Sequence, residues 1–379
     1  DNNFGRSRLY FGDQDMHISP SWLPNGNELL LVSNRDVALG SGDVIRVPAE
    51  ADGMARRQTV LAEQTLYRTR PDVSIDGKRF IYSSTSGTAD QFNNLYVQPT
   101  VGGEPYKLTF FQHDAFHPRW SPDGEWIAFI SNEGGLPQLE LLETYGGARR
   151  RIDITERRFK EPMGTLQVTV RADGAPTGAA TGAGTAARVS LTAADGKFYA
   201  PVDAYARITQ QGGFHMFHTT GSFTVELPPG STDLTVMKGF ELYPERQQVE
   251  IRAGEITSVT VTLRRMADLS ADGWHNGSTH VHTNYAGNLH NTLENMMYMS
   301  DAEDQDVVTE LIANKDNRVL DYQFFIPGGE AHPLSTPDRV LIVGEEYRPA
   351  FYGHVFMLGL EDHLISPFTT GYEGTAIES

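Results

Sequence analysis

Two histidines separated by a single residue, His280 and His282, are the residues of this chain best suited by type and spacing to do chemistry. They lie near the end of an alternating apolar and polar run, residues 277–283. In an extended strand, residues i and i+2 point to the same face, so both imidazoles can reach one cation beside the strand. Histidine is the commonest metal ligand, although such a pair also arises by chance on ordinary strands. The surrounding elements must decide between these two interpretations.

The sequence after the histidines predicts a helix and a second strand. Residues 291–305 carry helix formers with apolar positions at helical spacing, and Thr292 is a candidate N-cap. Residues 306–314 form an apolar run that is too short for a helix and is typical of a buried strand. Strand, helix and strand make a βαβ unit, and sheets of such units place ligand sites at the carboxyl ends of their strands. The histidine pair is predicted to lie at such a strand end.

Two further strand-like runs carry carboxylates and a histidine at their ends. One covers residues 340–346 and ends in Glu345 and Glu346, and the other opens near His354. If a hairpin turn is centred near Ala350, Glu346 faces His354 on one side of the strand pair and Glu345 faces away. We therefore expect Glu346 and His354 to lie on the same face of this strand pair.

The composition narrows the kinds of partner that this chain can have. Its 379 residues are enough for roughly two or three domains, and 39% hydrophobic with 21% charged residues is typical of a globular protein. The 31 basic and 49 acidic side chains give a net charge of -18, which argues against a nucleic acid partner or an anionic membrane surface. Without cysteine, any metal must be held by nitrogen and oxygen atoms. No apolar run approaches the roughly 18 to 20 residues of a membrane span.

Three similar segments recur at the start of the chain at intervals of roughly 50 residues. Each holds an Asn-Gly or Asp-Gly turn, at residues 25–26, 76–77 and 123–124, followed by a strand-like run that ends in Ser. Glycine tolerates the positive φ that such turns need. Short strands with this period predict the blades of a β-propeller. Residues 1–158 resemble the TolB-like propeller repeat, whose Ser-Pro-Asp-Gly motif is intact at residues 121–124.

Three blades make only a partial propeller, since closed rings typically carry about four to eight. Two explanations remain open. The chain begins inside a longer protein, which we favour, or the blades form an open arc that needs a partner surface. The second explanation makes the propeller a candidate site for a protein partner.

Residues 159–266 have the pattern of a small antiparallel β-sandwich. Four runs alternate between apolar and polar residues with a period of two, and Asp-Gly and Pro-Pro-Gly sequences supply turns between them. By this pattern the segment resembles the carboxypeptidase-regulatory type of Ig-like domain. The tract of small residues from Gly174 to Ala187 has too little side-chain volume to pack and is expected to form a loop.

Short motifs in residues 267–379 extend the candidate site beyond the histidine pair. They are Gly273-Trp274, residues 277–282, Asn284-Tyr285, Ala302-Glu303-Asp304, Asn314-Lys315, Arg318, Glu346 and Gly353-His354. Together they resemble the PHP superfamily of metallohydrolases, and specifically its CehA/McbA branch. The resemblance implies that this segment is the N-terminal part of a distorted (β/α) barrel that holds two or three divalent ions.

The same resemblance assigns ligands residue by residue. His280 and His282 match the first metal-binding motif, Glu346 matches the bridging glutamate, and His354 matches the histidine that follows it. Where the family has Thr-Asp-His, this chain has Thr-Glu-Leu, and Glu310 is assigned as the substitute ligand. Zinc or manganese suits a shell of histidine and carboxylate groups.

The full-length protein is expected to be a metal-dependent hydrolase that uses a metal-activated water on a carbamate, ester, amide or phosphoester bond. Its substrate would be a small molecule or a fragment of a polymer. Asn314 and Lys315 are candidate catalytic groups that polarise the substrate, or equally the polar residues of a solvated loop. The family's later motifs have no counterpart after His354, and the segment is too short for a barrel of about 200 or more residues. The shortened chain is therefore expected to be inactive.

The alternative is a non-catalytic module in which propeller and sandwich bind a polymer or a protein and the barrel segment is degenerate. Divalent metal that the protein binds and that the variant His282→Ala loses would favour the enzyme over the binding module. Composition leaves the compartment open, while the order of domains, which is similar to that of the family, favours a periplasmic or secreted protein.

Overall fold

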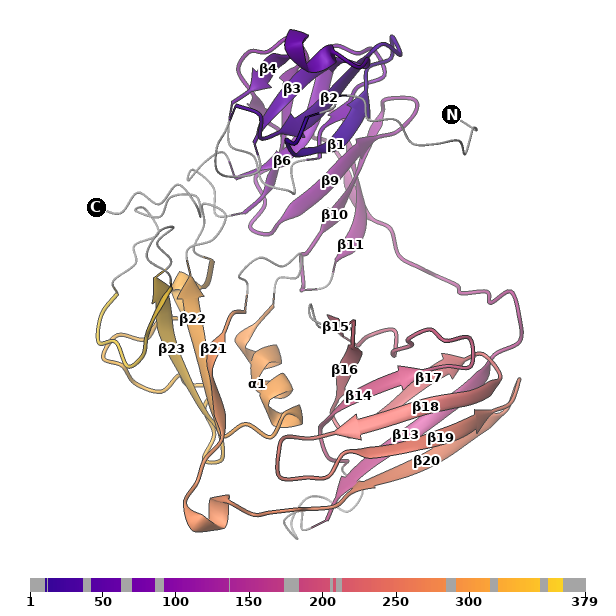
Figure 1. The fold of residues 1–379 in the computed structure, drawn as a ribbon, viewed down its shortest axis with the longest axis vertical. Helices are drawn as coiled ribbons and strands as arrows, with labels where there is room; N and C mark the ends of the chain where they lie inside the picture. The colour runs from indigo at the N-terminus through magenta and orange to yellow at the C-terminus, as the bar shows by residue number, and fades with distance from the viewer. Residues whose placement is uncertain are drawn as a thin grey trace.

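The computed structural model of the chain is built almost wholly from β-strands, which form several separate sheets (Figure 1). Three sheets follow one another at the start of the chain, two sheets form a sandwich in the middle, and a mixed sheet with a helix lies at the end. The structure describes residues 11, 13–36, 42–62, 70–85, 92–135, 137–173, 184–204, 207–208, 213–283, 291–313, 320–347 and 354–363.

The first three sheets are four-stranded and antiparallel, and the strands of each follow one another in chain order, as in propeller blades. The first blade has β1 (His17–Trp22), β2 (Glu28–Ser33), β3 (Asp43–Pro48) and β4 (Gln58–Leu61), with a short helix at Gly53–Arg56. The second has β5 (Asp72–Val73), β6 (Arg79–Ser84), β7 (Asn94–Pro99) and β8 (Tyr106–Lys107). The third has β9 (Ala115–Trp120), β10 (Trp126–Ser131), β11 (Gln138–Glu143) and β12 (Arg149–Arg151).

Glycine turns set the spacing of the blades, as the sequence predicts. Gly26, Gly77 and Gly124 have φ values of 71°, 71° and 74°, in the left-handed region where residues other than glycine are strained. The strand predicted after each turn is confirmed as β2, β6 or β10. Buried side chains of neighbouring blades then pack against one another. Phe80 and Tyr82 of β6 belong to the same apolar cluster as buried residues of the first blade.

The sandwich has two sheets, with strand orders β17-β13-β20 and β15-β16-β14-β18-β19. Its core lies between them and is made by the inward-facing apolar residues that alternate along each strand. One pair corrects the expectation of an antiparallel fold, because β13 and β20 are parallel. Alternation predicts that a segment is a strand but says nothing about the direction of its partner. The strands are β13 (Gly164–Ala172), β14 (Ala187–Thr192), β15 (Arg207–Ile208), β16 (His215–Thr219), β17 (Ser222–Leu227), β18 (Gly230–Met237), β19 (Glu245–Ile251) and β20 (Ile256–Leu263).

The last unit confirms the predicted βαβ arrangement. Its sheet has the order β21-β22-β23-β24, with the first three strands parallel and β24 antiparallel to β23. The predicted N-cap is also confirmed, because the side chain of Thr292 accepts a hydrogen bond from the Asn295 amide at 3.2 Å. Among the described residues the sheet is open, and closure into a barrel remains an expectation. The elements are β21 (Gly277–Val281), α1 (Leu293–Ala302), β22 (Val307–Ala313), β23 (Val340–Tyr347) and β24 (Val355–Met357), with short helices at Ser270–Asp272 and Leu320–Phe324.

The two faces of this sheet have different surroundings. Leu293 and Met296 of α1 pack against Val308 of β22 and Leu341 of β23, so α1 covers the face on which these two strand residues lie. Glu346 lies an odd number of positions after Leu341 in the same strand and therefore points to the other side. We call the side under α1 the covered face and the side of Glu346 the histidine face.

An irregularity in β21 decides on which face the two histidines lie. Ser278 pairs with Val308, but the next paired residue, Val281, is opposite Glu310, so three steps along β21 match two steps along β22. In a regular strand both histidines would share the covered face with Val308. The extra residue of this β-bulge moves them to the histidine face.

Helix α1 lies between the sheet of its own unit and the sandwich (Figure 1). Beyond the end of the helix, Glu303 meets the sandwich residue His218, with Oε1 and Nε2 2.7 Å apart. Lys238 of the sandwich donates a hydrogen bond to the backbone carbonyl of Asp301 in the last turn. None of the described helices has the length and apolar character that a membrane crossing requires.

Candidate metal centre

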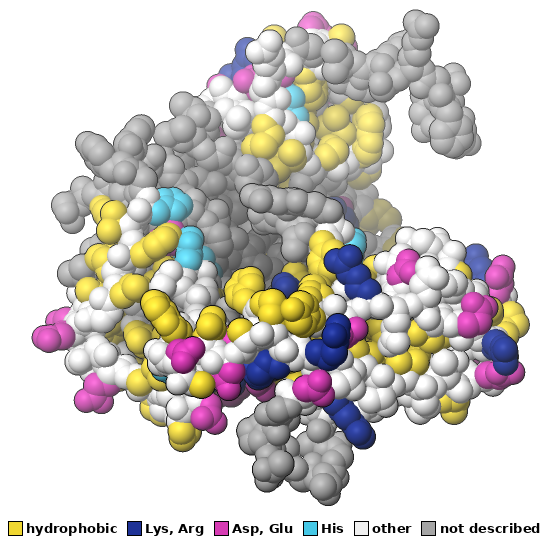
Figure 2. Space-filling view, turned by 60° about the horizontal axis from the view of Figure 1, so that its bottom comes forward, with side chains coloured by type: hydrophobic (Ala, Val, Ile, Leu, Met, Phe, Trp, Pro, Cys, Tyr) yellow, Lys and Arg dark blue, Asp and Glu magenta, His cyan; other side chains and the backbone are white. Residues whose placement is uncertain are grey.

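Three side chains of the histidine face converge on one point. The Nε2 atoms of His280 and His282 are 3.1 Å apart. Oε2 of Glu346 lies 2.7 Å from Nε2 of His282 and 3.7 Å from Nε2 of His280. Donors that surround one zinc ion tetrahedrally at about 2.0 to 2.1 Å lie roughly 3.4 Å from each other. The three atoms are therefore spaced as the donors of a shared cation are. Figure 2 shows histidine side chains reaching the surface on the side of the molecule where this sheet lies.

The hydrogen bond of His282 fixes which of its nitrogens is presented to the other two residues. Its Nδ1 lies 2.8 Å from the backbone carbonyl oxygen of Leu311, which can only accept, so Nδ1 carries the proton and donates. In the neutral ring Nε2 then presents a lone pair toward the carboxylate of Glu346, 2.7 Å away. Two acceptors at that distance require a proton or a cation between them. Backbone carbonyls that accept a hydrogen bond from the other ring nitrogen orient metal-binding histidines in this way.

His354 is also at the site, although the predicted strand register is wrong by two residues. Glu346 pairs with Phe356, whereas the prediction placed it opposite His354. A shift of two keeps each side chain on its face, which is why the contact survives. His354 Nδ1 lies 2.6 Å from Glu346 Oε1, and the Phe356 ring packs 4.1 Å from the ring of His280.

Glu310 does not join this group, so its assignment as a ligand of the same centre is corrected. Its carboxylate accepts hydrogen bonds from the amide and the hydroxyl of Thr283, at 3.0 and 2.5 Å. Glu310 pairs with Val343 and so shares the covered face, away from Glu346. Burial, together with the charge of Asp321, raises its pKa well above the ordinary value.

Glu345 faces away from the centre, as the sequence predicts. It is fully buried, and its Oε1 lies 2.9 Å from Nδ1 of His363. The ring of His363 stacks on Tyr322 and meets Phe325 at a tilt, with ring centroids 4.0 and 3.9 Å away. The candidate catalytic residues Asn314 and Lys315 lie outside the described residues.

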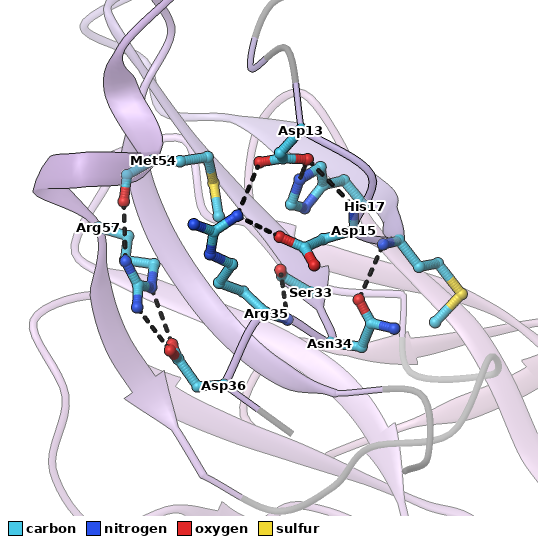
Figure 3. Close-up of polar contacts among 10 residues, drawn as sticks. Asp13, Asp15, His17, Ser33, Asn34, Arg35, Asp36, Met54 and Arg57 are labelled. Atoms are coloured by element: carbon cyan, nitrogen blue, oxygen red, sulfur yellow. Dashed lines mark hydrogen bonds and ion pairs between the residues drawn. The ribbon is translucent and has the colours of Figure 1, made fainter. Parts of the chain in front are cut away.

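A second group of ligand-type side chains lies in the first blade, where the sequence analysis does not place a site (Figure 3). Asp13, Asp15 and His17 follow an alternating spacing, which is the signal that would have found them. His17 Nε2 lies 2.8 Å from Asp13 Oδ1. The guanidinium of Arg35 reaches both carboxylates, at 3.6 Å from Asp13 and 2.5 Å from Asp15. Because Arg35 already supplies a positive charge to this group, we do not treat it as a cation site.

Comparison with known proteins relates part of the chain to TolB. No family model matches the sequence. It is 35% identical over 99 residues to the uncharacterized peptidase YuxL of Bacillus subtilis, covering 25% of this chain and 15% of that protein. It is 28% identical over 116 residues to the Tol-Pal system protein TolB of Roseobacter denitrificans, covering 30% of this chain and 26% of that protein. The chain thus spans about a quarter or less of these curated relatives.

Two solved structures match parts of the chain at low sequence identity. TolB from Acinetobacter baumannii is 16% identical, with a TM-score of 0.30, and the match covers 64% of this chain and 56% of that one. A puromycin hydrolase is 13% identical, with a TM-score of 0.29, over 63% of this chain and 36% of that one. From the sequence relatives and the repeated blades, the chain contains a TolB-like propeller segment.

Proposed function

We propose that the histidine face holds a divalent ion, zinc or manganese, and that this centre belongs to a metal-dependent hydrolase. His280, His282 and Glu346 would be its ligands. The observation that supports it best is the orientation of His282, whose Nδ1 is committed to the Leu311 carbonyl while Nε2 points at Glu346. The rest of the face is arranged to keep this geometry.

Each neighbouring residue has a role in the proposed reaction. A divalent ion lowers the pKa of a coordinated water and polarises the oxygen of the scissile bond. His354 holds the second carboxylate oxygen of Glu346, which leaves Oε2 directed at the histidines. The ring of Phe356 shields one side of His280. Asn314 and Lys315 are proposed to polarise the substrate, a small or polymer-derived carbamate, ester, amide or phosphoester.

Metal binding tests the first half of the proposal. The protein is stripped with a chelator, loaded with zinc or manganese, desalted and analysed for bound metal, alongside His282→Ala. His275→Ala is the matched control, because His275 is an exposed histidine of the same segment whose Nδ1 contacts Asp306 rather than the site. We expect bound metal in the wild type and the control and none in His282→Ala. Equal metal content in all three proteins would refute the assignment.

Turnover tests the second half. The metal-loaded protein is assayed with p-nitrophenyl acetate and bis(p-nitrophenyl) phosphate, which report on ester and phosphodiester hydrolysis. Hydrolysis that requires both the metal and His282 supports the enzyme. Metal binding without hydrolysis of either compound would count against the hydrolase and in favour of a binding module.

The binding module is the second candidate function, and exposed aromatic residues on the propeller favour it. Tyr106 and Phe110 lie beside the end of the second blade, and Tyr145 lies on a turn of the third; all three are more than 60% exposed. The Tyr145 turn packs near Leu108, so the three residues belong to one region. The TolB relative is named for the Tol-Pal system, which agrees with a protein partner.

A double variant tests this second candidate. Phe110→Ser with Tyr145→Ser should abolish crosslinking of the propeller to a partner protein while metal content stays at the wild-type level. Unchanged crosslinking would exclude this surface. A partner of this kind, and the arrangement of domains, fit a periplasmic or secreted location, which we propose for this protein.

A further inference from the structure

A cleft of about 500 Å³ lies between the sandwich and α1, apart from the metal centre. The sandwich contributes the end of β16, the first half of β17 and a loop that contains Asp203. The helix contributes Asn295, Tyr298 and Met299, which lie three and four positions apart and therefore on one side of α1. The opposite side of the helix, with Leu293 and Met296, is packed against its own sheet. The volume is in the range of about 300 to 1,000 Å³ that small-molecule sites occupy.

Contacts between the two units hold the walls of the cleft in place. His218, at its base, is buried and pairs with Glu303 at 2.7 Å. Its ring also meets the Tyr298 ring edge to face, with centroids 6.4 Å apart. Lys238 is bound to the last turn of α1 through the Asp301 carbonyl. The cleft is therefore formed by the fold and does not depend on a single loop.

The described part of the lining combines polar groups with the ring of Tyr298. Among the described residues that line the cleft, none is Lys or Arg. Thr220, Ser222 and Thr224 bring hydroxyl groups. Burial, with the nearby charges of Asp203 and Asp301, raises the pKa of Tyr298 to about 12, so its phenol stays protonated and can donate. Such a lining disfavours anions and offers donors, acceptors and apolar ring surface together.

We propose that this cleft binds a neutral polyhydroxylated ligand, a mono- or disaccharide. The ring of Tyr298 supplies apolar surface, and the hydroxyl groups of β17, Asn295 and Asp203 hydrogen-bond the ligand. Tyrosine suits this role because it joins an apolar ring to a polar end. The site is independent of the proposed hydrolase, since it uses the side of α1 that faces away from the metal centre.

Binding is measured with named sugars on the whole protein. Glucose, N-acetylglucosamine and cellobiose serve as neutral probes, glucosamine as a cation and glucuronate as an anion, each followed by saturation-transfer NMR and calorimetry. We expect at least one neutral sugar to bind with a dissociation constant of about 1 mM or tighter. Binding of glucuronate as tight as that of the neutral sugars would overturn the proposal. So would binding of glucosamine alone, or of none of the probes.

Three variants place the bound sugar in the cleft. Tyr298→Phe keeps the ring and removes one hydrogen bond, so binding should weaken about five- to tenfold. Asp203→Asn replaces a charged acceptor with a neutral one and should weaken binding of a neutral sugar about three- to tenfold, because a hydrogen bond to a charged group is the stronger. Tyr243→Phe is the control, because Tyr243 lies on the sandwich outside the cleft. Thermal unfolding at the wild-type temperature confirms that each variant is folded; unchanged binding in folded Tyr298→Phe would refute the site.

Discussion

Two adjacent glutamates of β23 have opposite environments. Glu345 points to the covered face, where it is sealed with His363 under Tyr322 and Phe325. Glu346 points to the histidine face, where three imidazoles approach it and two of them, His280 and His354, are nearly half exposed. Both carboxylates are almost inaccessible to solvent.

Burial alone therefore does not separate a structural carboxylate from a candidate ligand. What separates them is the number and accessibility of the basic groups that meet each one. Glu345 has one histidine, which packs against two aromatic rings, whereas Glu346 has histidine nitrogens that converge beside a surface. Matched substitutions on the two faces should therefore have different consequences.

The largest effect is expected for Glu346→Ala. Removal of one of three converging donors should weaken zinc binding about a hundredfold or more, because outer-shell partners alone contribute about 10- to 100-fold. Competition with a chromophoric chelator measures the change. A zinc affinity within about threefold of the wild type would show that Glu346 is as structural as its neighbour.

Glu345→Ala is the matched substitution on the covered face. It leaves a cavity in the covered face and unpairs His363, so we expect the free energy of unfolding to fall by about 2 to 3 kcal/mol. Zinc affinity should stay within about threefold of the wild type. Urea unfolding of the metal-free proteins gives the first quantity and chelator competition the second. Loss of zinc binding in a folded Glu345→Ala protein would remove the distinction between the faces.

His354→Ala tests a group that acts through Glu346. Without His354 the carboxylate can rotate, and zinc binding should weaken about tenfold, the low end of the range for outer-shell partners. His354→Gln, which can still donate to Oε1 of Glu346, should restore most of the affinity. If both variants bind zinc like the wild type, His354 does not position Glu346.

The smallest effect concerns Glu310, on the covered face. Its raised pKa means that the folded state holds the proton more tightly than the unfolded chain. The resulting stability is fully present below about pH 4.5 and is lost as the pH rises through the folded-state pKa. Glu310→Gln resembles the protonated form, so its free energy of unfolding should rise relative to that of the wild type as the pH increases from 5 to 8. Urea unfolding at pH 5 and pH 8 measures the difference in the free energy of unfolding between the variant and the wild type. An equal difference at both pH values would mean that Glu310 does not titrate between them.

Local patterns were enough to predict most of the strands. Turn glycines, alternation and helix capping are properties of a few consecutive residues, and they located β2, β6, β10, α1 and β22 correctly. The parallel pairing of β13 with β20 was missed because it joins segments about 90 residues apart. The partnership of His218 with Glu303 was missed for the same reason, with 85 residues between them.

The candidate site was predicted in part. His280, His282, Glu346 and His354 are brought together because an error of two in register preserves the face of a strand. Glu310 was assigned to the wrong face of the sheet. The face on which a residue of β22 lies depends on whether its position in the strand is odd or even, and similarity to a motif does not take this into account. His363 gave no signal, since its stacking on Tyr322 and Phe325 is set by tertiary structure.

The β-bulge of β21 also means that the spacing ahead of the histidine pair is not fixed. Deletion of one residue between Ser278 and Val281, such as Thr279, would restore regular pairing, keep Val281 opposite Glu310 and leave both imidazoles on the histidine face. A search for this site in other chains must therefore allow a gap of one residue ahead of the pair, because a strand with the bulge and a strand shorter by one residue present the histidines on the same side of the sheet.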